Sequence, residues 1–199
     1  KRANLYNPSD DFPYHSTDYA SAVLVQPDSM IVVVGHSYHE LQTRHLVAVR
    51  FSPDGMLDKI MAAVPGGIGA AEQDPVYQDG LAAALQPDGK IVAAGIFYTQ
   101  HPDLGQVPSF FLVRFDTAGK TDDSFDGNGL KIIDIDIYDR ASAVAILPDG
   151  KILAAGHAYR RFDQYSDFNL ESDIAMVRLD SAGVLDTDFA NAGIAVEPV

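Results

Sequence analysis

Residues 20–35 read ASAVLVQPDSMIVVVG, and the same phrase returns at residues 80–95 (GLAAALQPDGKIVAAG) and 141–156 (ASAVAILPDGKILAAG). The proline of each copy lies 60 or 61 residues from the next one: Pro27, Pro87 and Pro148. A repeat of this length is one supersecondary unit that buries its apolar surface against neighbouring copies. The period therefore predicts a repeat architecture with three units.

Each copy contains two short apolar segments on either side of a turn. In the second copy, residues 82–85 and 91–94 flank the sequence Pro87-Asp88-Gly89. Apolar runs this short, bounded by turn residues, are typical of strands buried on both faces and are too short for helices. Pro, Asp and Gly together favour a bulged hairpin, because glycine adopts the left-handed conformation that closes it. Ser29 replaces this glycine in the first copy, so we expect a different or strained turn there.

Two further strands complete each unit. A third strand is predicted at residues 46–51 (LVAVRF), 110–115 (FFLVRF) and 174–179 (IAMVRL), each followed by a second turn. A fourth is clearest at residues 130–137, weaker at 194–196 and poorly defined at 60–64. Four antiparallel strands in about 60 residues make a propeller blade, with the alanine-rich first strand innermost. The sequence therefore predicts an all-β, β-propeller-like array of three four-stranded antiparallel blades.

The units divide the chain into an N-terminal extension or cap at residues 1–19 and blades at 20–79, 80–140 and 141–199 of a single repeat domain. Closed propellers have roughly four to eight blades, so three blades leave an apolar face bare at each end. We therefore expect a part of a larger propeller, or a ring closed by copies of the same chain. A six-bladed dimer is the simplest symmetric solution.

The composition limits the partners of this acidic protein. There are 28 acidic and 14 basic residues, for a net charge of −14, and no cysteine. This charge disfavours nucleic acids and anionic membranes, and the lack of cysteine excludes disulfides and thiol chemistry. No apolar stretch approaches the ~20 residues of a membrane span, so no membrane insertion is expected. The first residue is Lys1, which indicates a mature secreted protein or a piece of a longer one.

The order of the repeated segments resembles a known family. In the second unit, PDGKIVAAG is followed by a variable loop, then FFLVRF, and then DDSFDGNG at residues 122–129. This pattern, which extends over residues 20–199, is similar to the delta-60 repeat, a bacterial β-propeller-type repeat of secreted and surface-associated proteins. The resemblance implies a propeller architecture and a secreted, periplasmic or cell-surface location. It implies no catalytic residues.

An arginine near the end of every third strand is followed eight residues later by an aspartate. The spacing brings the two side chains close together across a tight hairpin, where they can form a charge-assisted pair. Because the pair recurs in each blade, we interpret it as structural. The three predicted pairs are Arg50 with Asp58, Arg114 with Asp122, and Arg178 with Asp186.

The turn after Asp122 imitates the start of a calcium loop. Candidate ligands are Asp122, Ser124, Asp126 and Asn128. The glutamate expected at the twelfth position is absent, since Ile133 occupies it. The alternative is a turn in which Phe125 and Phe189 anchor the strand in the interblade core. Calcium is thus a possible ligand, and no other cofactor is expected.

Polar and aromatic residues gather between the second and third strands, where the distance from glycine to arginine grows from 15 to 19 and 22 residues. Variable loops on a rigid scaffold commonly bind partners, and Tyr, His and Arg are frequent in interfaces. The alternative is that the tyrosines only cover the blade edges. The candidate binding residues are Tyr38, Tyr98, Tyr159, His36, His157, Arg160 and Arg161.

These features favour a non-catalytic propeller scaffold or binding module of a secreted or surface-associated bacterial protein, which binds a protein or a glycan through these loops. The sequence contains no G-x-S-x-G, H-E-x-x-H or paired-carboxylate motif. Two alternatives stay open. One is a polysaccharide-directed hydrolase or lyase with carboxylates around an axial funnel, and the other is a purely structural spacer in a surface fibre or assembly.

Overall fold

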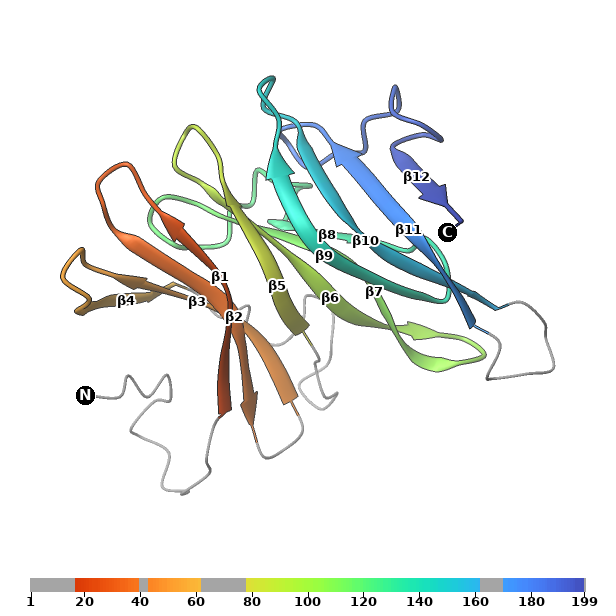
Figure 1. Ribbon diagram of the computed structural model, residues 1–199, viewed down its shortest axis with the longest axis horizontal. Coiled ribbons are helices and arrows are strands. Elements are labelled where there is room, and N and C mark those ends of the chain that lie inside the picture. Colours follow the sequence, from red (N-terminus) through yellow and green to blue (C-terminus); the bar gives the residue numbers. More distant parts are fainter. Residues whose placement is uncertain (1–16, 40–42, 62–77, 162–169, 199) are drawn as a thin grey trace.

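The fold consists of three antiparallel sheets side by side (Figure 1). The computed structural model describes residues 17–39, 43–61, 78–161 and 170–198. The first sheet contains β1 (Thr17–Val25), β2 (Ile31–His39), β3 (Thr43–Phe51) and β4 (Leu57–Met61). The second contains β5 (Gln78–Leu85), β6 (Ile91–His101), β7 (Gly105–Phe115) and β8 (Leu130–Ile133). The third contains β9 (Tyr138–Ile146), β10 (Ile152–Arg161), β11 (Leu170–Leu179) and β12 (Ile194–Glu197).

The predicted all-β array of three four-stranded antiparallel blades is confirmed, and we call the sheets blades 1, 2 and 3 in chain order. The first strands of successive blades lie next to each other, because β5 contacts β1 and β9 contacts β5. This is the arrangement expected of inner propeller strands. The part of the chain that the structure describes contains no helix with the length and apolar character needed to cross a bilayer.

Several strand boundaries differ from the expected ones. The first strands begin at Thr17, Gln78 and Tyr138. Of the expected N-terminal extension, residues 17–19 thus belong to β1, and residues 1–16 lie outside the described part. Strand β8 ends at Ile133 rather than at residue 137, because the next residues turn back toward blade 3. Strand β4 spans Leu57–Met61, earlier than the expected 60–64, of which 62–64 lie outside the described residues.

Each blade has two faces, and the two faces of a blade belong to different hydrophobic cores. We define the front face as the one that carries the first residue of the second strand (Ile31, Ile91 or Ile152), and the back face as the opposite one. Successive residues of a strand point to opposite faces. The back face of blade 1 packs on the front face of blade 2 through Val32, Val34, Leu46 and Ala48 against Ile91, Ala93, Phe111 and Val113. Blade 2 packs on blade 3 in the same way through Val92, Ala94, Phe110 and Leu112 against Ile152, Ala154, Ala175 and Val177.

The glycine that ends each repeated phrase lies opposite an irregular point of the first strand. The pairing of β5 with β6 shifts register between Gly80 and Ala82, opposite Gly95. A methyl group on Gly95 would overlap the backbone carbonyl oxygen of Asp79. The equivalent glycines of the other blades face the carbonyls of Tyr19 and Arg140 in the same way. The close backbone approach thus explains why each phrase ends in glycine.

The turn that contains Ser29 has the same geometry as its glycine-containing counterparts. The Ser29 amide donates to the Gln26 carbonyl at 2.8 Å, and the Gly89 amide donates to the Gln86 carbonyl at 2.9 Å. Ser29 adopts a φ of 67°, and Gly89 a φ of 85°. The expectation of a strained turn is therefore confirmed, because a residue with a side chain occupies the left-handed position. The expectation of a different turn is wrong.

Ser29→Gly is expected to raise the free energy of unfolding by about 1 kcal/mol, because it relieves the left-handed strain of a residue with a Cβ atom. Urea unfolding followed by circular dichroism would measure the change. The reciprocal control is Gly150→Ser in blade 3, where no atom lies within 4 Å of an added Cβ. It should lower stability by a similar amount, and equal stability of both variants and the wild type would contradict the explanation.

Candidate functional site

The three predicted Arg–Asp pairs all form at the turn end of the blades. In each, the arginine Nε donates to the aspartate Oδ2 over 2.7 Å, in Arg50–Asp58, Arg114–Asp122 and Arg178–Asp186. The spacing of eight residues thus places both partners across the hairpin between the third strand and the segment after it.

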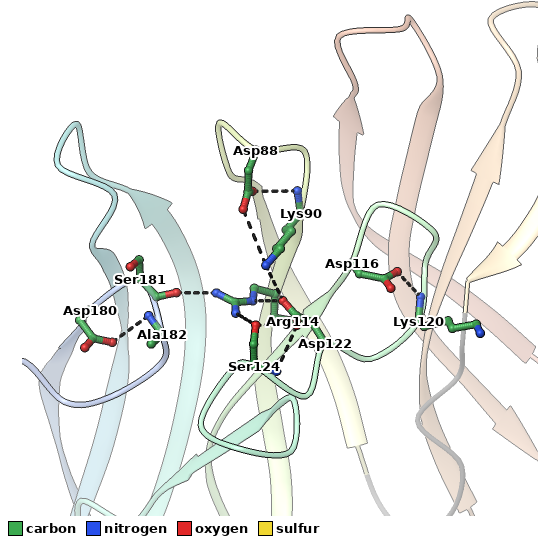
Figure 2. Close-up of polar contacts among 10 residues, drawn as sticks. All are labelled: Asp88, Lys90, Arg114, Asp116, Lys120, Asp122, Ser124, Asp180, Ser181 and Ala182. Carbon is green, nitrogen blue, oxygen red and sulfur yellow. Dashed lines mark hydrogen bonds and ion pairs between the residues drawn. The ribbon is translucent and has the colours of Figure 1, made fainter.

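Arg114 connects two blades (Figure 2). Its Nη2 donates to the Ser124 hydroxyl at 2.9 Å, and its Nη1 donates to the backbone carbonyl of Ser181 in blade 3. The guanidinium carbon lies 4.9 Å from the ring centroid of Phe125. The side chain is only 5% exposed. Arg114 is therefore a buried structural cation between blades 2 and 3.

The aspartates of blades 2 and 3 also receive a lysine. Lys90 Nζ lies 2.9 Å from Asp122, and Lys151 Nζ lies 2.7 Å from Asp186. Burial alone would raise the pKa of Asp122, but hydrogen bonds from Ser124 and Lys90 and the charge of Arg114 outweigh it and hold this pKa well below its usual range. The hydrogen bond from Lys151 likewise lowers the pKa of Asp186. Both carboxylates are therefore ionised and engaged within the fold.

The oxygens of the calcium candidates have partners within the protein. Asp122 accepts from Arg114 and Ser124. Both Asp126 oxygens face Lys131 Nζ, at 3.0 and 3.1 Å, and Asn128 Oδ1 accepts from the Leu130 amide. Among the residues that the structure describes, no group of three or more His, Asp or Glu side chains could hold a metal ion. A cation at this turn would compete with the neighbouring Arg and Lys charges.

The seven candidate binding residues lie in paired strands, and their expected placement in loops is wrong. His36 and Tyr38 belong to β2, Tyr98 to β6, and His157, Tyr159, Arg160 and Arg161 to β10. The ladder does not stop at the glycine but continues to the pair His39–Thr43 in blade 1 and to Arg161–Leu170 in blade 3. The side chains of Tyr38, Arg160 and Arg161 lie outside the described part of the chain.

The tyrosines occupy equivalent places in different blades. Tyr98 is paired with Pro108, and Tyr159 with Ser172; both tyrosines are partly buried. His157 meets Tyr159 edge to face at a centroid distance of 5.0 Å. Burial, assisted by the charge of Arg140, lowers the pKa of His157. His157 and Tyr159 therefore form a neutral aromatic pair on the back face of blade 3.

His36 belongs to a second cluster, between blades 1 and 2. It stacks on Tyr19 with ring centroids 5.0 Å apart, and its Nδ1 lies 3.9 Å from Asp79 Oδ1. Arg44 Nη1 lies 2.9 Å from Asp79 Oδ2. We call Tyr19, His36, Arg44 and Asp79 the His36 cluster. Within the described residues, His36 Nδ1 and Asp79 Oδ1 are buried without a hydrogen-bond partner.

The sequence did not point to Tyr19, Arg44 or Asp79. Asp79 directly precedes the repeated phrase of blade 2, and it approaches His36 of blade 1 only because the blades stack. Asp79 is 7% exposed, whereas Tyr19 is 54% exposed. The cluster therefore combines an accessible aromatic ring and an arginine with buried polar atoms that retain hydrogen-bonding capacity.

Asp139 is a buried carboxyl where the chain passes from blade 2 to blade 3. It is fully buried and accepts hydrogen bonds from the amides of Ile135 and Asp136, at 2.7 Å for Ile135. Burial raises the pKa of Asp139 to about 6; the charges of Asp134 and Asp136 act in the same direction, and the amide donors oppose them. This carboxyl closes the turn that ends blade 2.

The raised pKa predicts a pH dependence of stability. The folded protein binds the Asp139 proton more tightly than the unfolded chain, so the resulting stabilisation is present at low pH and lost as pH rises through about 6. Between pH 7 and 5 we expect Asp139 to add about 1 kcal/mol to the free energy of unfolding. Urea unfolding of the wild type and Asp139→Asn at both pH values isolates this contribution from that of His157. Identical pH slopes for both proteins would refute it.

Stacked four-stranded antiparallel sheets with one inner strand each define the class of β-propeller repeat proteins. The chain belongs to the family described as a domain of unknown function (DUF5122) β-propeller, whose model matches residues 26–59, 86–125 and 147–189. The fold is similar to the crystal structure of a protein of unknown function from Dyadobacter fermentans, with a TM-score of 0.55 and 15% identity over 86% of this chain. The match covers 53% of that protein, so this chain spans about half its length. No curated protein matches the chain.

Proposed function

We propose that the chain is a non-catalytic propeller scaffold of the delta-60 type that binds a glycan or protein, and that it belongs to a secreted, periplasmic or cell-surface bacterial protein. The observation that supports binding most directly is the His36 cluster. An exposed aromatic ring beside a partly exposed arginine suits a sugar, whose apolar ring face stacks on Tyr19 and whose hydroxyl groups accept hydrogen bonds from the Arg44 guanidinium. We therefore place a glycan before a protein as the ligand.

The carboxylates argue for binding rather than acid–base catalysis. Asp122 and Asp186 are held ionised by Arg and Lys, so neither suits the donation of a proton to a leaving group. Asp139 has a raised pKa but is fully buried beneath backbone amides. A glycosidase needs a protonated carboxyl within reach of its substrate. These three residues do not offer one, which favours the binding module over the polysaccharide-directed enzyme.

A glycan microarray probed with the fluorescently labelled chain tests the proposal. We expect one class of glycan to be bound, and Tyr19→Ala to weaken that binding at least tenfold with an unchanged melting temperature. Met56→Ala, which changes another exposed apolar side chain, is the control and should bind like the wild type. Binding that survives Tyr19→Ala would overturn the site. A chain that binds no glycan would favour a protein ligand or the structural spacer.

A further inference from the structure

Two complementary faces of the array have no blade against them in the described part of the chain. On the front face of blade 1, Val23 and Val25 are 66% and 65% exposed, whereas the equivalent Ala83 and Leu85 of blade 2 pack against a core. On the back face of blade 3, Ile174 is 51% exposed, whereas the equivalent Phe110 is fully buried. At both internal interfaces a back face packs on a front face. The two open faces are one of each type, so they can pack together in the same way.

The open front face is also hollowed. A pocket there is lined by Val33, Val47, Val49 and Phe51, together with residues 18–20 and Gly35. Val47 and Val49 are 8% and 6% exposed, and their equivalents in blades 2 and 3 are fully buried in the core under the back face of the preceding blade. Residues equivalent to Ile174 and Met176 fill this place inside the array, so the open back face carries suitable apolar side chains for the hollow.

At each internal interface a large apolar side chain of one blade fits beside a glycine of the next, and we call the side chain the plug and the glycine the socket. Three residues after each paired aspartate, a large apolar side chain enters the next blade beside the glycine of its second turn. Met61 lies in this way at Gly119, and Phe125 at Gly183, where an added Cβ would come within 2.7 Å of each side chain. Both plugs are buried, with exposures of 1% and 0%. The small size of glycine is what makes room for them.

In the part of the chain that the structure describes, the third plug and the first socket are unoccupied. Phe189 is the equivalent plug of blade 3, with the Arg178 guanidinium carbon 4.6 Å from its ring centroid, as Arg114 covers Phe125. Gly55 is the equivalent socket of blade 1, and no atom lies within 4 Å of a Cβ built on it. Blade 3 therefore carries a formed plug, and blade 1 carries an open socket.

Hydrogen bonds to the next blade accompany the Phe125 plug. At the interface of blades 2 and 3, the Asp126 amide donates to the Ala182 carbonyl at 2.8 Å, next to the bond from Arg114 to Ser181. Asp126 has a φ of 48°, and its equivalent in blade 3, Ala190, has a φ of 44°. Ala190 thus adopts the backbone conformation that directs the Asp126 amide into the next blade. The matching acceptors on the open socket are the carbonyls of Pro53 and Asp54.

We propose that a second copy of this chain occupies both open faces, so that two copies form a six-bladed ring. The back face of blade 3 packs on the partner copy's blade 1, with Phe189 in the socket at Gly55 and Arg178 donating to the Pro53 carbonyl. Two-fold symmetry repeats the contact on the other side and leaves no face bare.

Engineered cysteines test the contact, because the chain has none of its own. Asp54→Cys with Ala190→Cys copies the internal neighbours Ala182 and Asp126 across the proposed interface. Residues joined by a backbone hydrogen bond lie close enough for a disulfide to form. Mild oxidation of the double variant should produce a covalent dimer on a non-reducing gel, and each single variant should not.

The internal pair Asp126→Cys with Ala182→Cys is the positive control, which should lose its free thiols within one chain. If the control disulfide forms but the cysteines at positions 54 and 190 link no chains, a second copy does not occupy the two open faces. Phe189→Ala gives an independent readout and should weaken self-association at least tenfold by light scattering. Met56→Ala should leave it unchanged, because the equivalent Val184 stays 51% exposed at an internal interface. Equal effects of both would overturn the plug.

Discussion

Gly95→Ala is expected to lower the free energy of unfolding by ~3 kcal/mol or more, one of the largest effects of any single methyl group in this chain. The added methyl would overlap the carbonyl oxygen of Asp79, and this carbonyl and the Gly95 Cα atom that carries the methyl both belong to the backbone of paired strands. Relief would require β5 and β6 to separate, at the cost of ladder hydrogen bonds and of the interblade core that contains Ile91 and Ala93.

Urea unfolding of the wild type and the variant would measure this loss. The control is Gly105→Ala, at a glycine with a φ of 75° and no atom within 4 Å of an added Cβ. It reports the cost of the left-handed backbone alone, about 1 kcal/mol. If Gly95→Ala costs no more than Gly105→Ala, the close backbone approach is not what requires glycine.

Arg114→Ala is expected to cost about 3 kcal/mol, because it leaves the Asp122 carboxylate without its buried partner and breaks the bond to blade 3. Arg50→Ala removes the equivalent pair in blade 1, where Asp58 is 35% exposed, and should cost ~1 kcal/mol or less. Thermal and urea unfolding of both variants would give the difference. Equal losses would show that burial and the contact with the next blade do not matter.

The blades could be predicted because their signals are local and repeated. Alternating apolar segments and turn residues located the strands, and a fixed spacing of eight residues located the pairs such as Arg114–Asp122. The suggestion that Phe125 anchors its turn in the interblade core matches its full burial. These features depend on one hairpin at a time, which a sequence records directly.

The His36 cluster could not be predicted, since it depends on how blades stack. Asp79 approaches His36 from the next blade, and Tyr19 approaches it from a strand that starts before the repeated phrase. The prediction that the candidate binding residues lie in loops was wrong for a different reason. Residues such as Tyr98 and Tyr159 follow a glycine that looked like a strand end, but this glycine accommodates a bulge within a ladder that continues.

The central claim is that the back face of one blade always packs on the front face of the next, including between two copies of the chain. Size-exclusion chromatography with light scattering tests it most directly, because it measures the absolute mass in solution. The account predicts a single species of about twice the 21.5 kDa of one chain. A monomer at every concentration would contradict it.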